Sequence, residues 1–147
     1  MRFWDSSAII PLLVEESMTN ALVDLYRADS LLLAWWGTGV ECISALARLE
    51  RSGGISQDAM TAALGRLGEI QSCWQEIQPL DRIREIAARL LRVHNLRAAD
   101  SLQLAAAVAA SNDRPPSLDF VCLDDRLVLA ARREGFNVIA VDQTDRL

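Results

Sequence analysis

Short hydrophobic segments and longer amphipathic ones alternate along the chain. The short segments at residues 2–4, 31–34, 120–123 and 136–141 are mainly hydrophobic and typical of buried strands, and residues 74–80 can form a further extended segment. Helical spacing and helix-stop residues predict helices at residues 6–16, 17–28, 38–52, 57–70, 81–94, 96–110 and 125–135. Pro11 is expected to interrupt or kink the first helix, and Gly53-Gly54 to stop the third.

Strands that are hydrophobic along their whole length are covered on both faces, which is typical of a parallel sheet between helices. The sequence has no internal repeat, linker or low-complexity tract. The pattern therefore predicts one α/β domain over residues 1–147.

The composition is that of a globular protein, with 147 residues, 51% hydrophobic and 24% charged. Hydrophobic runs are far shorter than the ~18–20 residues of a membrane helix. The N-terminal segment is broken by Asp5 and closes on Glu15 and Glu16, so it makes a poor signal peptide. We expect no membrane segment and a cytoplasmic location.

Cysteine and histidine chemistry has little support in the sequence. Cys42, Cys73 and Cys122 form no CxxC pair, and His94 is the single histidine, which argues against a Cys/His zinc site. We expect three buried, reduced thiols and a surface His94.

All 15 basic residues are arginine. The absence of lysine removes the P-loop lysine, a Schiff-base lysine and the lysine of receiver domains. The catalytic chemistry that remains is that of carboxylates, and we expect them to act together with a bound metal ion. The net charge of −5 argues against binding nucleic acid by bulk charge, although a local basic groove is compatible with it.

Acidic residues follow the predicted strands. Asp5 and Asp124 come after strand segments, Glu41 lies one turn into the helix after residues 31–34, and Asp100 stands at the head of the most apolar helix. Because ligands of such sheets bind beyond the carboxyl ends of the strands, three of these four positions are expected to face the same edge of the sheet.

Helix capping is the alternative for each acid alone. Aspartate is a favoured N-cap, the segment DSLQ at 100–103 resembles a capping box, and Asp125 could cap in place of Asp124. Glu41 alone could be a solvated helix residue. Both interpretations stay open for each residue taken singly.

Taken together, the four acids favour the interpretation that they bind a cation. Two carboxylates ~4 Å apart repel by ~4 kcal/mol at an effective dielectric constant of ~20. Several such pairs would offset most of the ~5–15 kcal/mol by which a domain is stable. Ligation by oxygen alone selects Mg²⁺ or Mn²⁺, and such ions assist the hydrolysis of phosphodiesters.

Four motifs resemble those of the PIN-domain proteins, specifically the VapC-like ribonuclease toxins of bacterial toxin–antitoxin pairs. They are DSS at 5–7, Glu41 in VECISALARLE, Asp100 in RAADSLQLAAA and Asp124 in FVCLDDRLVLAARREGFNV. The resemblance covers essentially the full length of the chain.

The resemblance implies a PIN-like three-layer α/β fold, with a parallel sheet of about five strands flanked by helices. Asp5, Glu41, Asp100 and Asp124 would be the metal-binding and catalytic acids, and Ser7 could hold a metal-bound water. The implied activity is endoribonuclease cleavage of RNA by a water that Mg²⁺ or Mn²⁺ activates. A homodimer and inhibition by a cognate antitoxin are implied as well.

Some positions depart from the family pattern or have no place in it. Cys122 stands where the family commonly has Ser or Thr two residues before the fourth acid. For Trp35-Trp36 we favour the core over an antitoxin groove or a base-stacking surface.

The stretch 81–97 is the most basic part of the chain. It could be a phosphate-contacting rim or, slightly favoured, a solvated face paired with Glu85. Arg48 and Arg51 could contact phosphates, or one of them could pair with Glu50.

Two other classes of function are alternatives to the nuclease. A PIN-like module that binds RNA or an antitoxin without turnover would have no reason to keep four repelling acids. A HAD-type phosphatase would need a DxD motif after the first strand and a lysine, and the sequence has neither.

Overall fold

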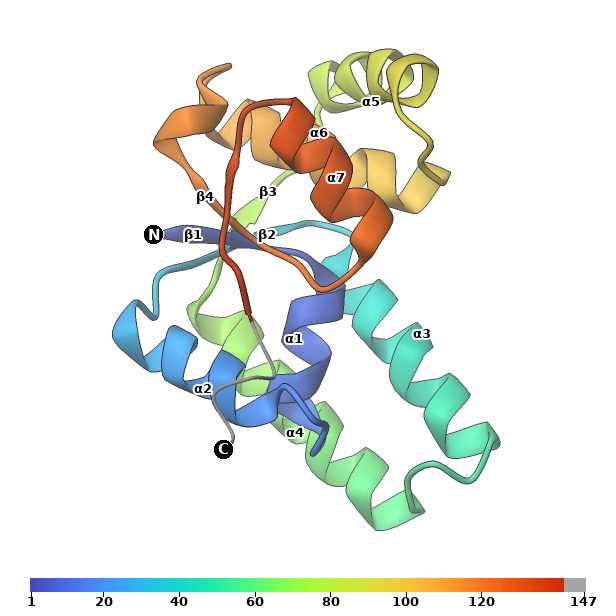
Figure 1. Ribbon diagram of the computed structural model, residues 1–147. Helices are drawn as coiled ribbons and strands as arrows, with labels where there is room; N and C mark the ends of the chain where they lie inside the picture. The colour runs from blue at the N-terminus through green and yellow to red at the C-terminus, as the bar shows by residue number, and fades with distance from the viewer. Residues whose placement is uncertain (142–147) are drawn as a thin grey trace.

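Five parallel strands form the centre of the computed structural model, which describes residues 1–141 (Figure 1). The strands are β1 (Arg2–Trp4), β2 (Leu32–Trp35), β3 (Gln75–Ile77), β4 (Asp119–Val121) and β5 (Asn137–Val138). Their order across the sheet is β3-β2-β1-β4-β5, and every neighbouring pair is parallel. Phe3 of β1 is in register with Leu33 on one side and Phe120 on the other.

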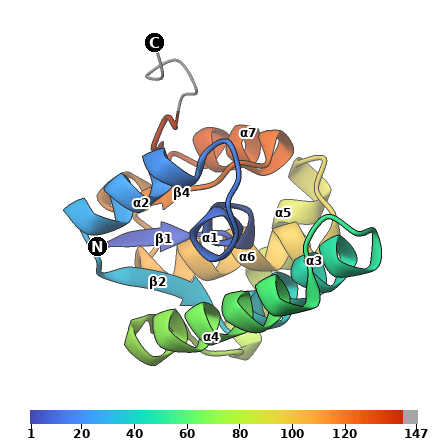
Figure 2. The same ribbon diagram turned by 90° about the horizontal axis from the view of Figure 1, so that it is seen from below.

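Helices cover both faces of this sheet (Figures 1 and 2). One face packs against α1 (Ser6–Leu13), α2 (Thr19–Ala28), α3 (Thr38–Arg51) and α4 (Gln57–Cys73). The other packs against α5 (Asp81–Val93), α6 (Ala98–Ala110) and α7 (Asp125–Arg133). The predicted three-layer α/β architecture is therefore confirmed.

The alternation of side chains along the short strands divides the core into two. Trp4, Ala34 and Val121 belong to the cluster with α1–α4. Phe3 and Phe120 belong to the opposite cluster, where their rings stack with centroids 5.4 Å apart. The central strands β1, β2 and β4 are buried on both faces, which explains why their sequences are mainly hydrophobic, whereas the edge strand β3 is largely exposed and carries Gln75 and Glu76.

Boundaries differ from the sequence expectation mainly at element ends. The first helix contains Pro11 and ends at Leu13 rather than at residue 16, and Thr19 Oγ1 donates a hydrogen bond to the carbonyl of Pro11 over 2.7 Å. The last strand is confined to residues 137–138, and β4 covers residues 119–121 instead of 120–123.

Two expectations for single residues are wrong. Cys42 and Cys122 are buried free thiols as expected, but Cys73, the last residue of α4, is exposed. His94 is buried rather than on the surface, because its Nε2 lies 2.7 Å from Glu134 Oε2.

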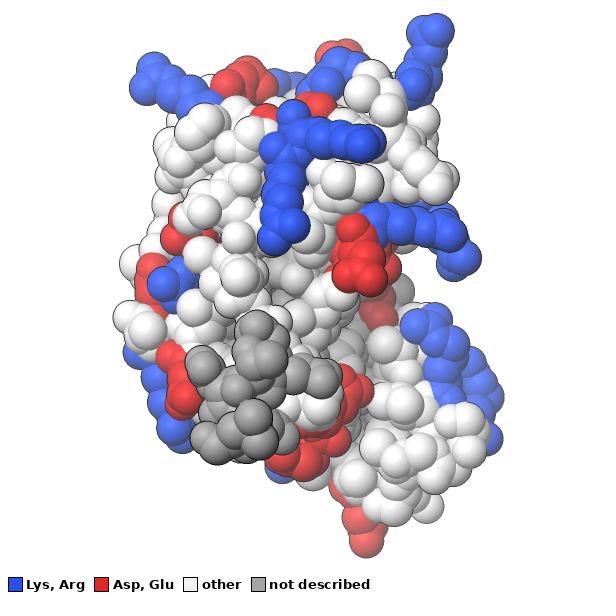
Figure 3. Space-filling model, viewed as in Figure 1, with Lys and Arg blue, Asp and Glu red and all other residues white. Residues whose placement is uncertain are grey.

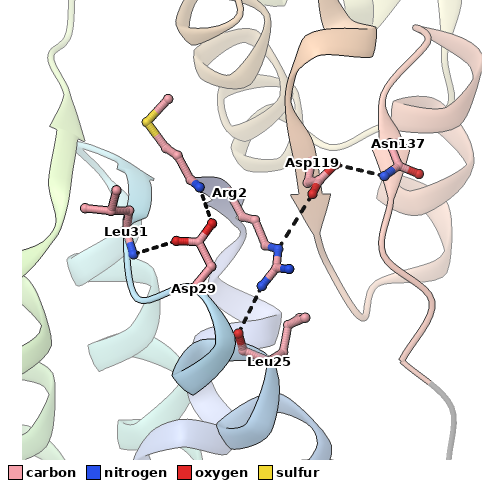
Figure 4. A network of polar contacts seen from close by, with 7 residues as sticks. Arg2, Leu25, Asp29, Leu31, Asp119 and Asn137 are labelled. Atoms are coloured by element: carbon pink, nitrogen blue, oxygen red, sulfur yellow. Dashed lines mark hydrogen bonds and ion pairs between the residues drawn. The ribbon is translucent and has the colours of Figure 1, made fainter.

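Ion pairs and hydrogen bonds close the amino ends of the strands (Figure 4). Arg2 donates from Nη1 to the carbonyl of Leu25 over 3.0 Å, and its Nε lies 3.6 Å from Asp119 Oδ2. Asn137 Nδ2 donates to Asp119 Oδ1 over 2.8 Å. This edge therefore ties β1, β4 and the start of β5 to the end of α2.

Within residues 1–141, no helix combines the length and the apolar character needed to cross a membrane.

Candidate active site

The carboxyl end of β1 is the topological switch point of the sheet. β2 and β4 flank β1, and the helices that follow β1 and β4, α1 and α7, lie on opposite faces. Such a divergence opens a crevice beyond the carboxyl ends of the two strands. Asp5 follows β1 directly, and Asp124 is the third residue after β4.

All four predicted acids line one cleft of about 490 Å³, together with Ser7. A neighbouring hollow of about 400 Å³ shares Asp100 and Asp124 with it. In the space-filling view, acidic side chains gather in the hollow between α7 and α3, with basic side chains on both sides (Figure 3). Chain segments that are far apart in sequence thus bring their carboxylates to one place.

Asp5 is the most deeply buried of these acids, with 3% of its surface exposed. It caps α1, and its Oδ2 accepts hydrogen bonds from the backbone N–H of Ser7 over 3.1 Å and from the Ser7 hydroxyl over 2.5 Å. Burial raises the pKa of Asp5 despite these hydrogen bonds, and the nearby Asp100 carboxylate adds to the rise. Capping and membership of the acid cluster are therefore compatible in one residue.

Ser7 and Cys122 connect Asp5 to the segment after β4. The Ser7 hydroxyl accepts a hydrogen bond from the backbone N–H of Leu123 over 3.0 Å. Cys122 Sγ lies 3.5 Å from Asp5 Oδ2 and accepts the backbone N–H of Asp124 over 3.3 Å. Burial raises the pKa of the Cys122 thiol, so the thiol stays protonated and acts as a weak hydrogen-bond donor.

Glu41 lies in the first turn of α3 and is half-buried. The pKa of Glu41 is raised to about 7, chiefly by burial; the charges of Asp5 and Asp100 add to the rise, and a hydrogen bond from Gln103 opposes it. Gln103 Nε2 donates to Glu41 Oε2 and, over 2.9 Å, to Thr38 Oγ1. Gln103 was not among the predicted site residues, and the signal for it was its place as the one polar side chain in the apolar stretch 102–110.

Asp100 is not the N-cap of its helix. The cap is Arg97, and Asp100 occupies the third helical position, where a hydrogen bond joins it to the backbone of Arg97. The predicted capping box at 100–103 is therefore wrong in register. Asp100 occupies the third helical position, whose side chain bonds back to the cap residue, and not the cap position itself. Burial raises the pKa of Asp100, as does the charge of Asp124, while Arg97 and Arg126 lower it.

Asp124 is exposed and caps α7, its Oδ1 accepting the backbone N–H of Leu127 over 3.0 Å. Asp125 lies in the first turn of α7 and is not the cap. The capping alternative for Asp124 is thus confirmed alongside its place in the cleft.

Arginines from three elements border the acids. Arg48 of α3 lines the main cleft, where its Nη1 lies 3.3 Å from Ser44 Oγ. Arg97 lines both hollows, and Arg126 of α7 lines the second. Guanidinium groups on two sides of an acid cleft can contact the phosphates of a polynucleotide on either side of the reacting bond.

Three other arginines of the basic stretch are engaged in ion pairs. Arg84 pairs with Asp81 over 2.8 Å and Arg89 with Glu134 over 2.8 Å. Arg82 pairs with Asp113. The solvated, paired face favoured from the sequence is correct for these residues, although their partners are not the expected Glu85.

The two tryptophans before Glu41 have different environments. Trp35 is buried in the core, as favoured, whereas Trp36 is 55% exposed. Trp36 adjoins the start of α3, which carries Glu41 in its first turn.

The donor set fits a hard divalent cation, because all four side chains are carboxylates. The pKa values of Asp5, Glu41 and Asp100 are each raised in part by the charge of another acid of the cleft. Within residues 1–141, no three Asp, Glu, His or Cys side chains converge closely enough to hold a metal directly. Mg²⁺ keeps several of its waters and binds through one or two carboxylates, which suits such an open arrangement.

Comparison with known proteins bears on the fold. No protein-family model and no curated protein sequence matches the chain. The structure is similar to that of FitAcB from Neisseria gonorrhoeae, with a TM-score of 0.65 and 16% identity over 95% of this chain and 97% of that one. It is also similar to PAE2754 from Pyrobaculum aerophilum, with a TM-score of 0.57 and 20% identity over 88% and 83% of the two chains.

These similarities, together with the five-stranded parallel sheet, confirm the PIN-like fold that the sequence predicted.

Proposed function

We propose that this chain is a Mg²⁺- or Mn²⁺-dependent endoribonuclease and the toxin of a toxin–antitoxin pair. The observation that carries the proposal is the gathering of Asp5, Glu41, Asp100 and Asp124 in one cleft at the switch point of a PIN-like sheet. Four mutually repelling acids in one cleft have a physical reason if they hold a cation.

In this proposal the acidic side chains bind the cation and the arginine side chains bind the substrate. The acids of the cleft would hold the metal, one or two of them directly and the others through its waters, and when bound the metal supplies activation of water and stabilisation of charge on the phosphodiester. Ser7 fixes the orientation of the Asp5 carboxylate through two hydrogen bonds. Arg48 on one side and Arg97 on the other are placed to contact the RNA backbone.

The partners belong to the same proposal. The resemblance to the VapC-like toxins implies a cognate antitoxin and a homodimer. The fold similarity to FitAcB supports the expectation of an antitoxin partner. A cytoplasmic location agrees with both an RNA substrate and a protein inhibitor.

The second candidate is a PIN-like module that binds RNA or an antitoxin without turnover. It is favoured by the absence of three converging ligands among residues 1–141. The two candidates differ in one property, the cleavage of RNA in the presence of Mn²⁺.

The deciding experiment compares wild type, Asp100→Asn and Asp58→Asn, each expressed alone and assayed on RNA after purification with and without Mn²⁺. Asp58 is an exposed acid of α4 and serves as the matched control. A nuclease toxin arrests growth and cleaves RNA in wild type and Asp58→Asn but not in Asp100→Asn. A wild type that binds RNA without cutting it supports the binding module, and equal toxicity of all three contradicts the catalytic role of Asp100.

A further inference from the structure

Gln103 is a fully buried amide in the middle of the most apolar helix. Its side chain has 0% exposure, and its neighbours Leu104, Ala105 and Ala106 are buried as completely. Glutamine is rarely buried to this extent unless its polar atoms have partners.

The Gln103 amide bridges the two helical layers at the carboxyl edge of the sheet. Nε2 uses its two protons to donate to Glu41 Oε2 and to Thr38 Oγ1. Both acceptors lie in the first turn of α3, while Gln103 lies in α6 on the opposite face of the sheet. An ionised carboxylate only accepts hydrogen bonds, so the amide nitrogen faces Glu41 when that group carries its charge.

Gln103 is also one helical turn beyond Asp100, since residues three apart share a helix face. The side chain that holds Glu41 is therefore mounted on the same helix that carries Asp100. This arrangement fixes the two acids relative to each other across the cleft, although they belong to different layers.

This arrangement has a cost in stability. Gln103 Oε1 is buried and, among the described residues, has no hydrogen-bond partner. A buried acceptor without a partner is destabilising, and an apolar side chain of the same size would avoid the cost. Packing therefore gives no reason for a glutamine here, whereas the Glu41 contact does.

We propose that Gln103 is a positioning residue that holds the Glu41 carboxylate at the cleft in a fixed relation to Asp100. The inference rests on the proposed function, because it concerns the same metal-binding acids. Loss of a partner that orients a metal ligand typically weakens metal binding by roughly 10- to 100-fold.

The test is a calorimetric titration of wild type, Gln103→Met and Leu104→Met with Mn²⁺ alone. Methionine approximates the shape of glutamine without its donors, and Leu104→Met is a volume-conserving change at the adjacent buried position. We expect Gln103→Met to bind Mn²⁺ about 10- to 100-fold more weakly and Leu104→Met to bind as wild type does.

A double-mutant cycle separates positioning from a general structural effect. Glu41→Gln should weaken Mn²⁺ binding, and adding Gln103→Met to it should cause no further loss, because the residue being positioned has lost its charge. An equal loss in both backgrounds would overturn the proposal. The role of Gln103 is also wrong if Gln103→Met binds as tightly as wild type, while the proposed function stands.

A wild type that binds no Mn²⁺ contradicts the proposed function itself, and the inference with it. A further measurement needs no change at Gln103, and so remains decisive if Gln103→Met does not fold. In nuclear magnetic resonance spectra of the wild-type protein, addition of Mg²⁺ should shift the side-chain amide signals of Gln103. Signals that stay in place at saturating Mg²⁺ would overturn the proposal.

Discussion

The Ser7 hydroxyl donates a hydrogen bond to the Asp5 carboxylate over 2.5 Å and accepts one from the backbone N–H of Leu123. Ser7→Ala removes both contacts at once. We expect a loss of stability of ~1–3 kcal/mol from the unpaired N–H and a Mn²⁺ affinity about 10-fold weaker. Urea unfolding and calorimetry measure the two effects separately. Unchanged Mn²⁺ affinity would show that Ser7 orients nothing at the site.

The raised pKa of Glu41 predicts a pH-dependent stability of the metal-free protein. A carboxyl whose pKa rises from 4.5 in the unfolded chain to about 7 in the fold favours the folded state at low pH. That contribution is complete below pH 4.5 and is lost as the pH rises through about 7. Unfolding by urea in EDTA should therefore require less free energy at pH 8 than at pH 5, by on the order of 2 kcal/mol.

Glu41→Gln should abolish this component and be more stable than wild type at pH 8 in EDTA. Glu50→Gln, at an exposed acid of the same helix, is the matched control and should keep the wild-type pH profile. Excess Mn²⁺ should restore the stability of wild type but not raise that of Glu41→Gln to the same extent. Identical pH profiles for wild type and Glu41→Gln would contradict the prediction.

Arg97 lines both hollows beside the acids, so its guanidinium is expected to bind RNA rather than to take part in the chemical step. Arg97→Ala should raise KM for an RNA oligonucleotide by roughly 5- to 10-fold with a smaller effect on kcat, and it should flatten the dependence of binding on salt. Arg84, which pairs with Asp81 and lines neither hollow, provides the control variant Arg84→Ala. Equal KM values for Arg97→Ala and Arg84→Ala would remove Arg97 from the substrate path.

Glu134 predicts a second pH dependence of opposite sign, away from the cleft. Burial alone would raise the pKa of Glu134, but hydrogen bonds from Arg89 and His94 outweigh it and hold the pKa below its usual range. The stability that this group contributes is present above the ordinary glutamate pKa and is lost as the pH falls through the lowered value. Glu134→Gln should therefore destabilise the protein by ~1–3 kcal/mol at pH 7.

Thermal melting of Glu134→Gln and wild type between pH 3 and pH 7 tests this, with RNA cleavage as a second readout. The difference in stability should shrink toward pH 3, and cleavage at a temperature where both proteins are folded should be unaffected. A difference that is constant over the whole range would mean that Glu134 does not contribute through its charge.

The order of strands and helices was predictable because hydrophobic strands and amphipathic helices differ in period, and the sheet arrangement followed from the burial of both faces. The gathering of the acids was predictable for the same reason, since the carboxyl ends of parallel strands share an edge. Asp5 and Asp124 lie where this rule places them.

The errors concern side chains whose partners are distant in sequence. His94 is buried because it meets Glu134, 40 residues away, and no local pattern carries that contact. Gln103 was interpreted through its neighbour Asp100 as part of a helix cap, whereas its partner Glu41 lies 62 residues earlier. Trp36 is exposed beside the buried Trp35 because the chain leaves the sheet between them, and composition does not mark that point.

Because β1 has only three residues, its two aromatic side chains also set the register of the strand. Phe3 and Trp4 enter opposite cores, and Asp5 follows them with its backbone N–H bonded to the carbonyl of Val121 over 3.0 Å. A slip of one residue would exchange the two faces and carry the carboxylate away from the cleft. The packing of the two rings thus sets the register of β1 and with it the position of Asp5. A substitution that only loosens this packing is expected to displace the Asp5 carboxylate from the cleft.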